Sequence, residues 1–251
     1  MILAIIQARM SSSRLPGKVL KEVLGRPLIG YLLERLSASK RINKIIIATT
    51  TDKDDDVVYD YVKSLQFDVY RGSNQDVLSR YYFAAVKYKP DSVMRITADC
   101  PLIDPCICDR LIDFYIKEKA DYACLSQRFA EGLDSEIFTF KVLEDMHKNA
   151  KKKSEREHVS LFLHNNPGMF NKRILDNAAD DSKYRITVDE PEDFEVVKTL
   201  IESLYKANSD FFDFHAIKKF LDKNPEISRK NSHIIRNEGL LKSLQNDSTI
   251  I

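Results

Sequence analysis

Two cations lie close together in a short polar segment near the start of the chain. Arg14 and Lys18 are separated by Leu-Pro-Gly, and three serines stand directly before Arg14. Pro16 restricts the backbone and Gly17 frees it, so both cations can point at one place. An arginine fork and a lysine point charge suit a polyphosphate, which serine hydroxyls and amides can also surround. The alternative interpretation is a solvated basic loop.

Two aspartates provide a second chemical signal. Asp99 follows the apolar run 92–97, and Asp189 follows the run 184–188. Carboxylates at neighbouring strand ends would repel each other unless a cation lay between them. Mg²⁺ takes one or two carboxylates together with phosphate oxygens and waters. Asp189 could equally be an acid at the N-terminus of the helix that Pro191 begins.

The elements that must position these residues alternate along the chain. Apolar runs predict buried strands, and helical spacing predicts helices between them. The strands are expected at 2–8, 43–50, 67–70 and 92–97, and the helices from 27 and at 54–65, 75–88 and 104–117. This alternation predicts an α/β fold with a mostly parallel sheet, helices on both faces and right-handed crossovers.

The second half of the chain predicts a mixed region of the sheet. Further strands are expected at 122–126, 136–140 and 184–188, and further helices at 142–153, 155–165, 191–205 and 214–221. Ligands of an open parallel sheet bind beyond the carboxyl ends of its strands. The loop 9–18 and both aspartates are therefore expected at one edge of the sheet.

Composition and charge exclude several classes of protein. The 251 residues carry 39 Lys and Arg against 38 Asp and Glu, a net charge of +1, which argues against a strong generic nucleic-acid binder. No apolar stretch is long enough to span a membrane, and no secretory signal is recognisable, so a cytoplasmic protein with four reduced cysteines is expected. The Walker A and dinucleotide-binding motifs are absent, so a P-loop ATPase or an NAD dehydrogenase is poorly supported.

The segment IIQARMSSSRLPGKVL, residues 5–20, resembles the opening of the cytidylyltransferase family, and most closely its spore-coat-polysaccharide and flagellin-glycan branch. Further stretches that resemble this family are 70–73, 76–82, 95–103, 132–136, 156–159, 187–193 and 236–244. The resemblance implies a nucleotide-diphospho-sugar transferase fold of the GT-A type. It also implies transfer of CMP from CTP to a sugar acid, nonulosonic or KDO-like, with Mg²⁺ and release of pyrophosphate, for the synthesis of a surface glycan.

The resemblance also implies roles for individual residues. Arg14 and Lys18 would hold the triphosphate and act in catalysis with Asp99, while Asp99 and Asp189 would bind the metal. The remaining nucleotide-binding residues would be Ala8, Arg9, Met10, Ser11, Ser12 and Ser13. A homodimer is implied as well, with the segment 130–165 as its contact.

Other residues carry weaker hypotheses. Arg71 and Asp76 are expected to contact nucleotide or sugar, although a surface arginine and a helix-capping aspartate explain them equally well. Asp134 and Glu136 alternate on a predicted strand and are expected to bind sugar hydroxyls. Arg156 is expected to bind the sugar carboxylate, with Arg128 and Arg185 as other candidates and a solvated helix face as the alternative. The acidic run 54–56 is interpreted as the start of a helix and not as a metal site.

Domain organisation and two competing functions remain open at this point. We expect a nucleotidyltransferase domain over 1–224 and a C-terminal appendage over 225–251. One alternative is a metal-dependent glycosyltransferase of the GT-A fold. The other is a non-catalytic nucleotide-binding partner in a glycan complex.

Overall fold

Seven strands form one mixed sheet in the computed structural model, which describes residues 1–205, 212–245 and 247–249. Their order in space is β5-β4-β1-β6-β8-β7-β9. Neighbours among β5, β4, β1 and β6 are parallel, β8 is antiparallel to both of its neighbours, and β9 is parallel to β7. The bounds are β1 Ile2–Gln7, β4 Lys44–Thr50, β5 Asp68–Gly72, β6 Ser92–Thr97, β7 Tyr122–Leu125, β8 Glu136–Thr139 and β9 Lys172–Leu175.

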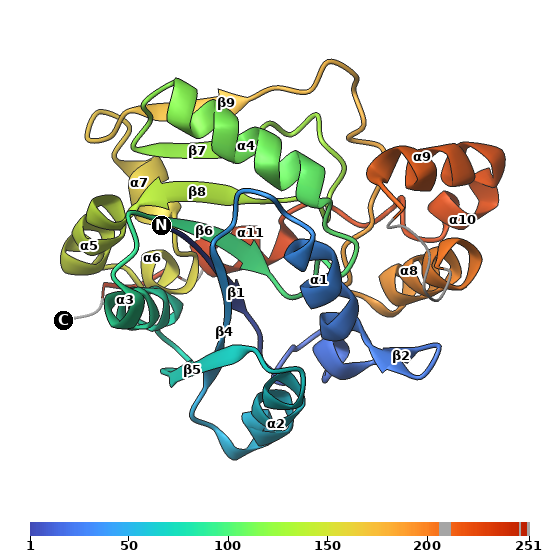
Figure 1. Cartoon of the computed structure of the whole chain (residues 1–251), viewed down its shortest axis with the longest axis horizontal. Helices are drawn as coiled ribbons and strands as arrows, with labels where there is room; N and C mark the ends of the chain where they lie inside the picture. The colour runs from blue at the N-terminus through green and yellow to red at the C-terminus, as the bar shows by residue number, and fades with distance from the viewer. Residues whose placement is uncertain (206–211, 246, 250–251) are drawn as a thin grey trace.

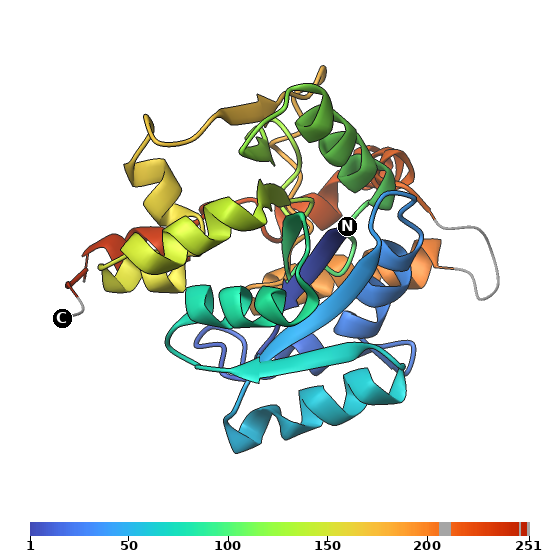
Figure 2. The ribbon, with the colours of Figure 1, turned by 60° about the vertical axis from the view of Figure 1, so that its left-hand side comes forward.

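Helices cover both faces of this sheet, which confirms the predicted fold class (Figure 2). One face carries α1 Leu28–Ser37, α2 Asp56–Ser64 and α4 Pro105–Lys117. The other carries α3 Val77–Tyr88, α5 Phe140–Asn149, α6 Lys153–Glu157 and α7 Leu161–Asn165. The alternation of β1 explains the two layers, because Ala4 and Ile6 pack into one core while Leu3 and Ile5 pack into the other.

A third group of helices lies at the side of the sheet, next to α1 (Figure 1). It consists of α8 Pro191–Leu204, α9 Phe214–Lys223 and α10 Pro225–Arg229. Its apolar core includes Leu133, Tyr184, Ile186 and Val188. A short hairpin of β2 Glu22–Val23 and β3 Arg26–Pro27 packs here too, after the 3₁₀ turn η1 Lys18–Leu20.

The predicted strand at 184–188 is wrong as a member of the sheet. Its only ladder contact among the described residues is one bridge between Arg185 and Glu131, and the edge strand of the sheet is β9 instead. The alternating Tyr184, Ile186 and Val188 are buried against the helices of the third group. The alternation of apolar residues correctly indicated an extended segment with one apolar face. That face packs on helices, and the segment is not a strand of the sheet.

The predicted helix at 155–165 is divided into α6 and α7. His158 has non-helical backbone angles, and the buried Val159 follows it. The other predicted helices are present within a few residues of their expected ends. None of the helices in the described part of the chain is long and apolar enough to cross a membrane.

The segment after residue 224 packs against the rest of the molecule. Ile227 belongs to the third core, and the buried Asn231 donates hydrogen bonds to the Arg185 carbonyl at 3.1 Å and to Asp193 at 2.9 Å. The segment ends in α11 Glu238–Gln245, which contacts α6. The division at residue 224 stays a prediction, and positions 206–211, 246 and 250–251 lie outside the described residues.

Candidate active site

The serine loop, residues 9–18, leaves the carboxyl end of β1 and folds back on itself. Gly17 has a positive φ of 69° and donates its amide to the Met10 carbonyl at 2.9 Å. This left-handed conformation is open to glycine at little cost, so Gly17 closes the loop just before Lys18. The loop therefore presents its serines and both cations on the side where the strand ends.

Asp55 fixes the start of this loop. The acidic run 54–56 lies at the start of helical structure, as predicted, with Asp55 as the N-cap of α2. Its side chain is only 2% exposed. It accepts a hydrogen bond from the Met10 amide at 2.6 Å and others from the amide and hydroxyl of Thr50. The short helix η2 Lys53–Asp55 directs this carboxylate inward, so one member of the acidic run joins β4 to the serine loop.

Lys18 lies between the two predicted metal ligands. Its ammonium donates to Asp189 at 2.7 Å, to Asp99 at 3.2 Å and to the Val188 carbonyl at 2.8 Å. Burial by itself would lower the pKa of Lys18, but the charges of Asp99 and Asp189 outweigh it and raise that pKa. Burial would likewise raise the pKa of Asp99, and Lys18 and Thr97 lower it instead. Lys18 and Asp99 are therefore charged at neutral pH.

Asp189 reaches Asp99 although it does not end a strand of the sheet. The Val188 amide and the Thr187 hydroxyl both donate to the Asp99 carbonyl, at 2.8 and 3.1 Å. On the other side, Asp193 accepts hydrogen bonds from the amides of Asp189 and Glu190 at 3.0 Å each. The backbone between residues 187 and 190 is thus held at both ends.

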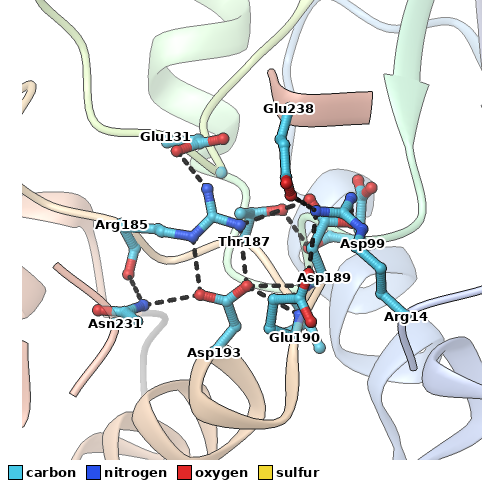
Figure 3. Close-up of polar contacts among 12 residues, drawn as sticks. Arg14, Asp99, Glu131, Arg185, Thr187, Asp189, Glu190, Asp193, Asn231 and Glu238 are labelled. Atoms are coloured by element: carbon cyan, nitrogen blue, oxygen red, sulfur yellow. Dashed lines mark hydrogen bonds and ion pairs between the residues drawn. The ribbon is translucent and has the colours of Figure 1, made fainter. Parts of the chain in front are cut away.

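Arg185 and Asp193 form a buried ion pair beneath this backbone (Figure 3). Two guanidinium nitrogens of Arg185 donate to Asp193 at 2.7 and 2.9 Å, and a third lies 2.5 Å from Glu131. Burial would lower the pKa of Arg185, but Asp193 and Glu131 raise it. Arg185, a candidate for the sugar carboxylate, is therefore already paired in the structure.

Arg14 points at the same place from the serine loop (Figure 3). Its guanidinium lies 3.0 Å from Asp189, 3.3 Å from Glu190 and 3.6 Å from Glu238 of α11. Both predicted phosphate-binding cations thus contact carboxylates in this structure. The cluster brings together residues that are up to 224 positions apart in the sequence, from Arg14 to Glu238.

Two cavities meet at the aspartates. The first, of about 500 Å³, is lined by the serine loop and both cations, and the second has about 600 Å³. Four residues line both cavities: Arg95, Thr97, Asp99 and Asp189. A ligand in each cavity would therefore place one group beside the same pair of carboxylates.

Most of the predicted nucleotide-binding residues line the first cavity. These are Ala8, Arg9, Ser11, Ser12, Ser13, Arg14 and Lys18, together with both aspartates. Met10 is outside the lining and packs its side chain on the apolar core of the sheet. The predicted sugar-binding Asp134 and Glu136 line the second cavity, but only Glu136 belongs to β8, and Asp134 precedes the strand. They are paired with Arg236 and Arg95 respectively.

Besides Met10, three predicted site residues lie outside both cavities. Arg71 donates to the carbonyls of Thr50 and Asp52 and pairs with Asp56. Asp76 accepts from the Ser79 amide at 2.8 Å as the N-cap of α3, and Arg156 forms an ion pair with it. The structure thus gives these residues contacts with one another and with the backbone, and it does not bring them to the serine loop.

Sequence reasoning missed several residues of the cavities. Gln7, Arg80, Arg95 and His158 line the first cavity, and each has a buried polar atom without a hydrogen-bond partner. Buried polar atoms are rarely unpaired in folded proteins, so their gathering here makes this cavity a candidate ligand site. Gln7 could have been identified from the sequence, since it is a polar residue that interrupts an apolar strand.

The C-terminal segment supplies walls for both cavities. Gly239 and Ser243 line the first, while Arg236 and Asn237 line the second. Arg236 donates to the carbonyls of Gln127 and Phe129 at 3.1 Å each. The prediction assigned these residues to a C-terminal appendage. A contact with loops more than 100 residues away leaves no pattern in the local sequence that would predict it.

The donor set fits Mg²⁺. One cation, the Lys18 ammonium, is bonded by oxygens of Asp99, Asp189 and Val188 together, so these oxygens already converge on a positive charge. Mg²⁺ prefers such oxygen ligands and commonly uses two carboxylates with substrate phosphates. Among the described residues no group of three or more His, Cys, Asp or Glu side chains could hold a metal. Asp99 and Asp189 would be the protein's two carboxylate ligands.

A mostly parallel sheet covered on both faces has the serine loop and two carboxylates at one edge, which is where open α/β sheets bind their ligands. The sequence model of the cytidylyltransferases matches residues 3–234. The chain therefore belongs to the cytidylyltransferase family, as its motifs predict.

Two relatives cover most of this chain. An uncharacterized protein of Methanocaldococcus jannaschii is 39% identical over 235 residues, which are 93% of this chain and 95% of that protein. The spore coat polysaccharide biosynthesis protein SpsF of Bacillus subtilis is 32% identical over 208 residues, 80% of this chain and 86% of its own length.

Solved structures share the fold. A cytidylyltransferase from Leptospira borgpetersenii has a TM-score of 0.86 with 34% identity, covering 94% of this chain and 99% of its own. The CMP:2-keto-3-deoxy-manno-octonic acid synthetase, solved with CTP, has a TM-score of 0.65 with 18% identity, covering 81% of this chain and 99% of its own.

Proposed function

We propose that this protein transfers CMP from CTP to a hydroxyl of a sugar acid, nonulosonic or KDO-like, and releases pyrophosphate, in the synthesis of a surface glycan. The observation that carries the proposal is the position of Lys18 between Asp99 and Asp189, the two carboxylates that line both cavities. The relatives named for spore coat polysaccharide synthesis and for a CMP-sugar-acid synthetase support the substrate class.

In this proposal CTP occupies the first cavity and the sugar acid the second. The acceptor hydroxyl forms a bond to the α-phosphorus, the bond from that phosphorus to the β-phosphate oxygen breaks, and the hydroxyl proton is released. Arg14 and Lys18 exchange their carboxylate partners for phosphate oxygens and offset the charge that grows on the leaving pyrophosphate. Such a reaction depends on positioning and electrostatics and needs no covalent nucleophile.

Asp99 and Asp189 would hold Mg²⁺ in this proposal. When bound, the ion would neutralise triphosphate oxygens and orient them. The chain's own contribution is to keep the two carboxylates close together. The Val188 amide and the Thr187 hydroxyl donate to the Asp99 carbonyl, and the amides of Asp189 and Glu190 donate to Asp193.

A pyrophosphate-release assay tests the proposal. The wild-type protein is incubated with Mg²⁺, each of four nucleoside triphosphates and a panel of sugar acids, and we expect release with CTP and a sugar acid only. Lys18→Ala and Asp99→Asn should each lower turnover by about 100-fold, the effect of removing one electrostatic contact to the reacting groups. Lys63→Ala and Asp60→Asn, both exposed on α2, are the matched controls and should keep wild-type turnover.

Three outcomes would contradict parts of this proposal. Wild-type turnover in both Lys18→Ala and Asp99→Asn would refute the assigned roles. Transfer from a sugar nucleotide without use of CTP would identify a glycosyltransferase instead. Binding of CTP without release of pyrophosphate from any acceptor would identify a non-catalytic partner.

The predicted homodimer with its contact at 130–165, the cytoplasmic location and the roles of Arg71, Asp76 and Arg156 stay predictions. Size-exclusion chromatography with light scattering tests the first of these. A monomer across the working concentration range would refute the dimer.

A further inference from the structure

Arg80 is a buried arginine without a carboxylate beside it. It lies in the first turns of α3 and is only 2% exposed. Its Nε and Nη1 atoms are buried and have no hydrogen-bond partner, and no ion pair neutralises it within the part of the chain that the structure describes. Fully buried arginines are rare unless they are paired, so this side chain is an exception that requires an explanation.

The surroundings of Arg80 are those of the first cavity. Arg80 lines it together with Gln7 and His158, which also have buried polar atoms without partners. The nearest acids are already engaged, since Asp76 pairs with Arg156 and Asp55 accepts from Met10 and Thr50. Burial lowers the pKa of Arg80 to about 10, and the positive charge of Arg9 contributes in the same direction.

Arg35 shows how this fold satisfies a buried arginine that has a structural role. Arg35 lies on α1, is 4% exposed, and burial lowers its pKa to about 10 as well. Its guanidinium donates to the carbonyls of Ile103 at 2.9 Å, Phe212 at 3.1 Å and Leu102 at 3.2 Å. The two arginines are equally buried, but only Arg35 has protein acceptors for its donors.

We propose that Arg80 binds the nucleotide, and that its buried nitrogens donate to an oxygen acceptor of the nucleoside triphosphate in the first cavity. The acceptor is a carbonyl of the base or a phosphate oxygen, which share the chemistry that a guanidinium recognises. This inference rests on the proposed function, because it requires CTP to occupy that cavity. It adds a binding residue from α3 to those of the serine loop.

The test compares Arg80→Met with Arg35→Met, each removing a buried guanidinium and keeping an apolar side chain of similar length. Isothermal titration with CTP and Mg²⁺ measures affinity, and thermal unfolding measures stability. We expect Arg80→Met to raise the Kd for CTP by about 10- to 100-fold, the loss of one hydrogen bond to a charged group. The same variant should unfold at a higher temperature than wild type, because it removes a buried charge without a partner.

Arg35→Met should behave in the opposite way, with an unchanged Kd for CTP and a lower unfolding temperature, because three carbonyls lose their donor. Titrations of Arg80→Met with cytidine and with tripolyphosphate then show whether the base or the phosphates provide the acceptor. Arg80→Lys, which keeps the charge, should retain part of the affinity that Arg80→Met loses.

An unchanged Kd of Arg80→Met for CTP would overturn the inference while leaving the proposed function intact. Loss of both stability and binding in Arg80→Met would also overturn it, since that result indicates a structural arginine like Arg35. Failure of the wild-type protein to bind CTP would instead refute the proposed function.

Discussion

At the scale of single residues, Asp193 connects the buried charge of Arg185 to the backbone of Asp189, a proposed metal ligand. It is fully buried and accepts hydrogen bonds from Arg185, from Asn231 and from the amides of Asp189 and Glu190. Burial would raise its pKa, but these donors lower it below the usual aspartate value. One carboxylate therefore neutralises an arginine and fixes the backbone that carries Asp189.

Asp193→Asn should lower the free energy of unfolding by about 3 kcal/mol, because Arg185 loses its fully buried partner. Urea unfolding at neutral pH measures this effect. The control is Asp145→Asn, which breaks an exposed ion pair with Lys141 on α5 and should change stability by less than about 0.5 kcal/mol. Equal effects of the two substitutions would show that the buried pair contributes no more than a surface pair.

At the scale of elements, α11 and the residues before it join distant parts of the site. Arg236 reaches the loop at 127–134, Glu238 reaches Arg14, and Ser243 donates to Glu157 of α6. The segment crosses the edge of the sheet where the first and second cavities meet. Its contact with Arg14 involves a cation that the proposed function assigns to the triphosphate.

Glu238→Gln should therefore lower the Kd for CTP by about 2- to 5-fold, because a competing carboxylate of a partly exposed pair is removed from Arg14. Isothermal titration with CTP and Mg²⁺ measures the change. Glu226→Gln, exposed on α10, is the control and should bind CTP as the wild type does. Weaker binding by Glu238→Gln would mean that Glu238 holds Arg14 in place for the nucleotide instead of competing with it.

At the scale of the whole molecule, three histidines pack on the α3 face of the sheet and connect folding to pH. Burial lowers the pKa of His147, His158 and His164 below the ordinary value of 6.5. The unfolded chain therefore binds protons more readily than the folded protein in this range. The contribution of these histidines to the free energy of unfolding is therefore fully present above about pH 6.5. It is lost as the pH falls toward the lower pKa values that the histidines have in the folded protein.

We expect the free energy of unfolding to be constant between pH 7 and 8 and to decrease from about pH 6.5 downward. Urea unfolding at a series of pH values measures the slope. The double variant His158→Gln and His164→Gln should flatten it, because two of the three groups are removed. A stability that stays level or rises on acidification to pH 5.5 would contradict this account.

The sequence predicted the parts of this molecule that have local signals. Arg14 and Lys18 were predicted at the carboxyl edge of the sheet because they lie in a polar loop after an apolar strand. Asp99 was predicted there because it follows the run 92–97. Arg156 and Asp76 pair across 80 residues, and no local pattern reveals such a contact. Arg80 was missed because a helical arginine resembles any surface residue until packing closes over it. Gln7 and Arg95 were readable, since each is a polar residue within a buried strand.

The placement of Lys18 means that the free protein carries its own counter-ion. An ammonium tethered to the chain already occupies the position between Asp99 and Asp189 to which a dication would be drawn. A magnesium ion arriving alone would have to displace the ammonium from both carboxylates. One arriving on a nucleoside triphosphate brings oxygens to which the ammonium can transfer. We therefore expect metal and nucleotide to load as a single unit, and the resting enzyme to hold neither.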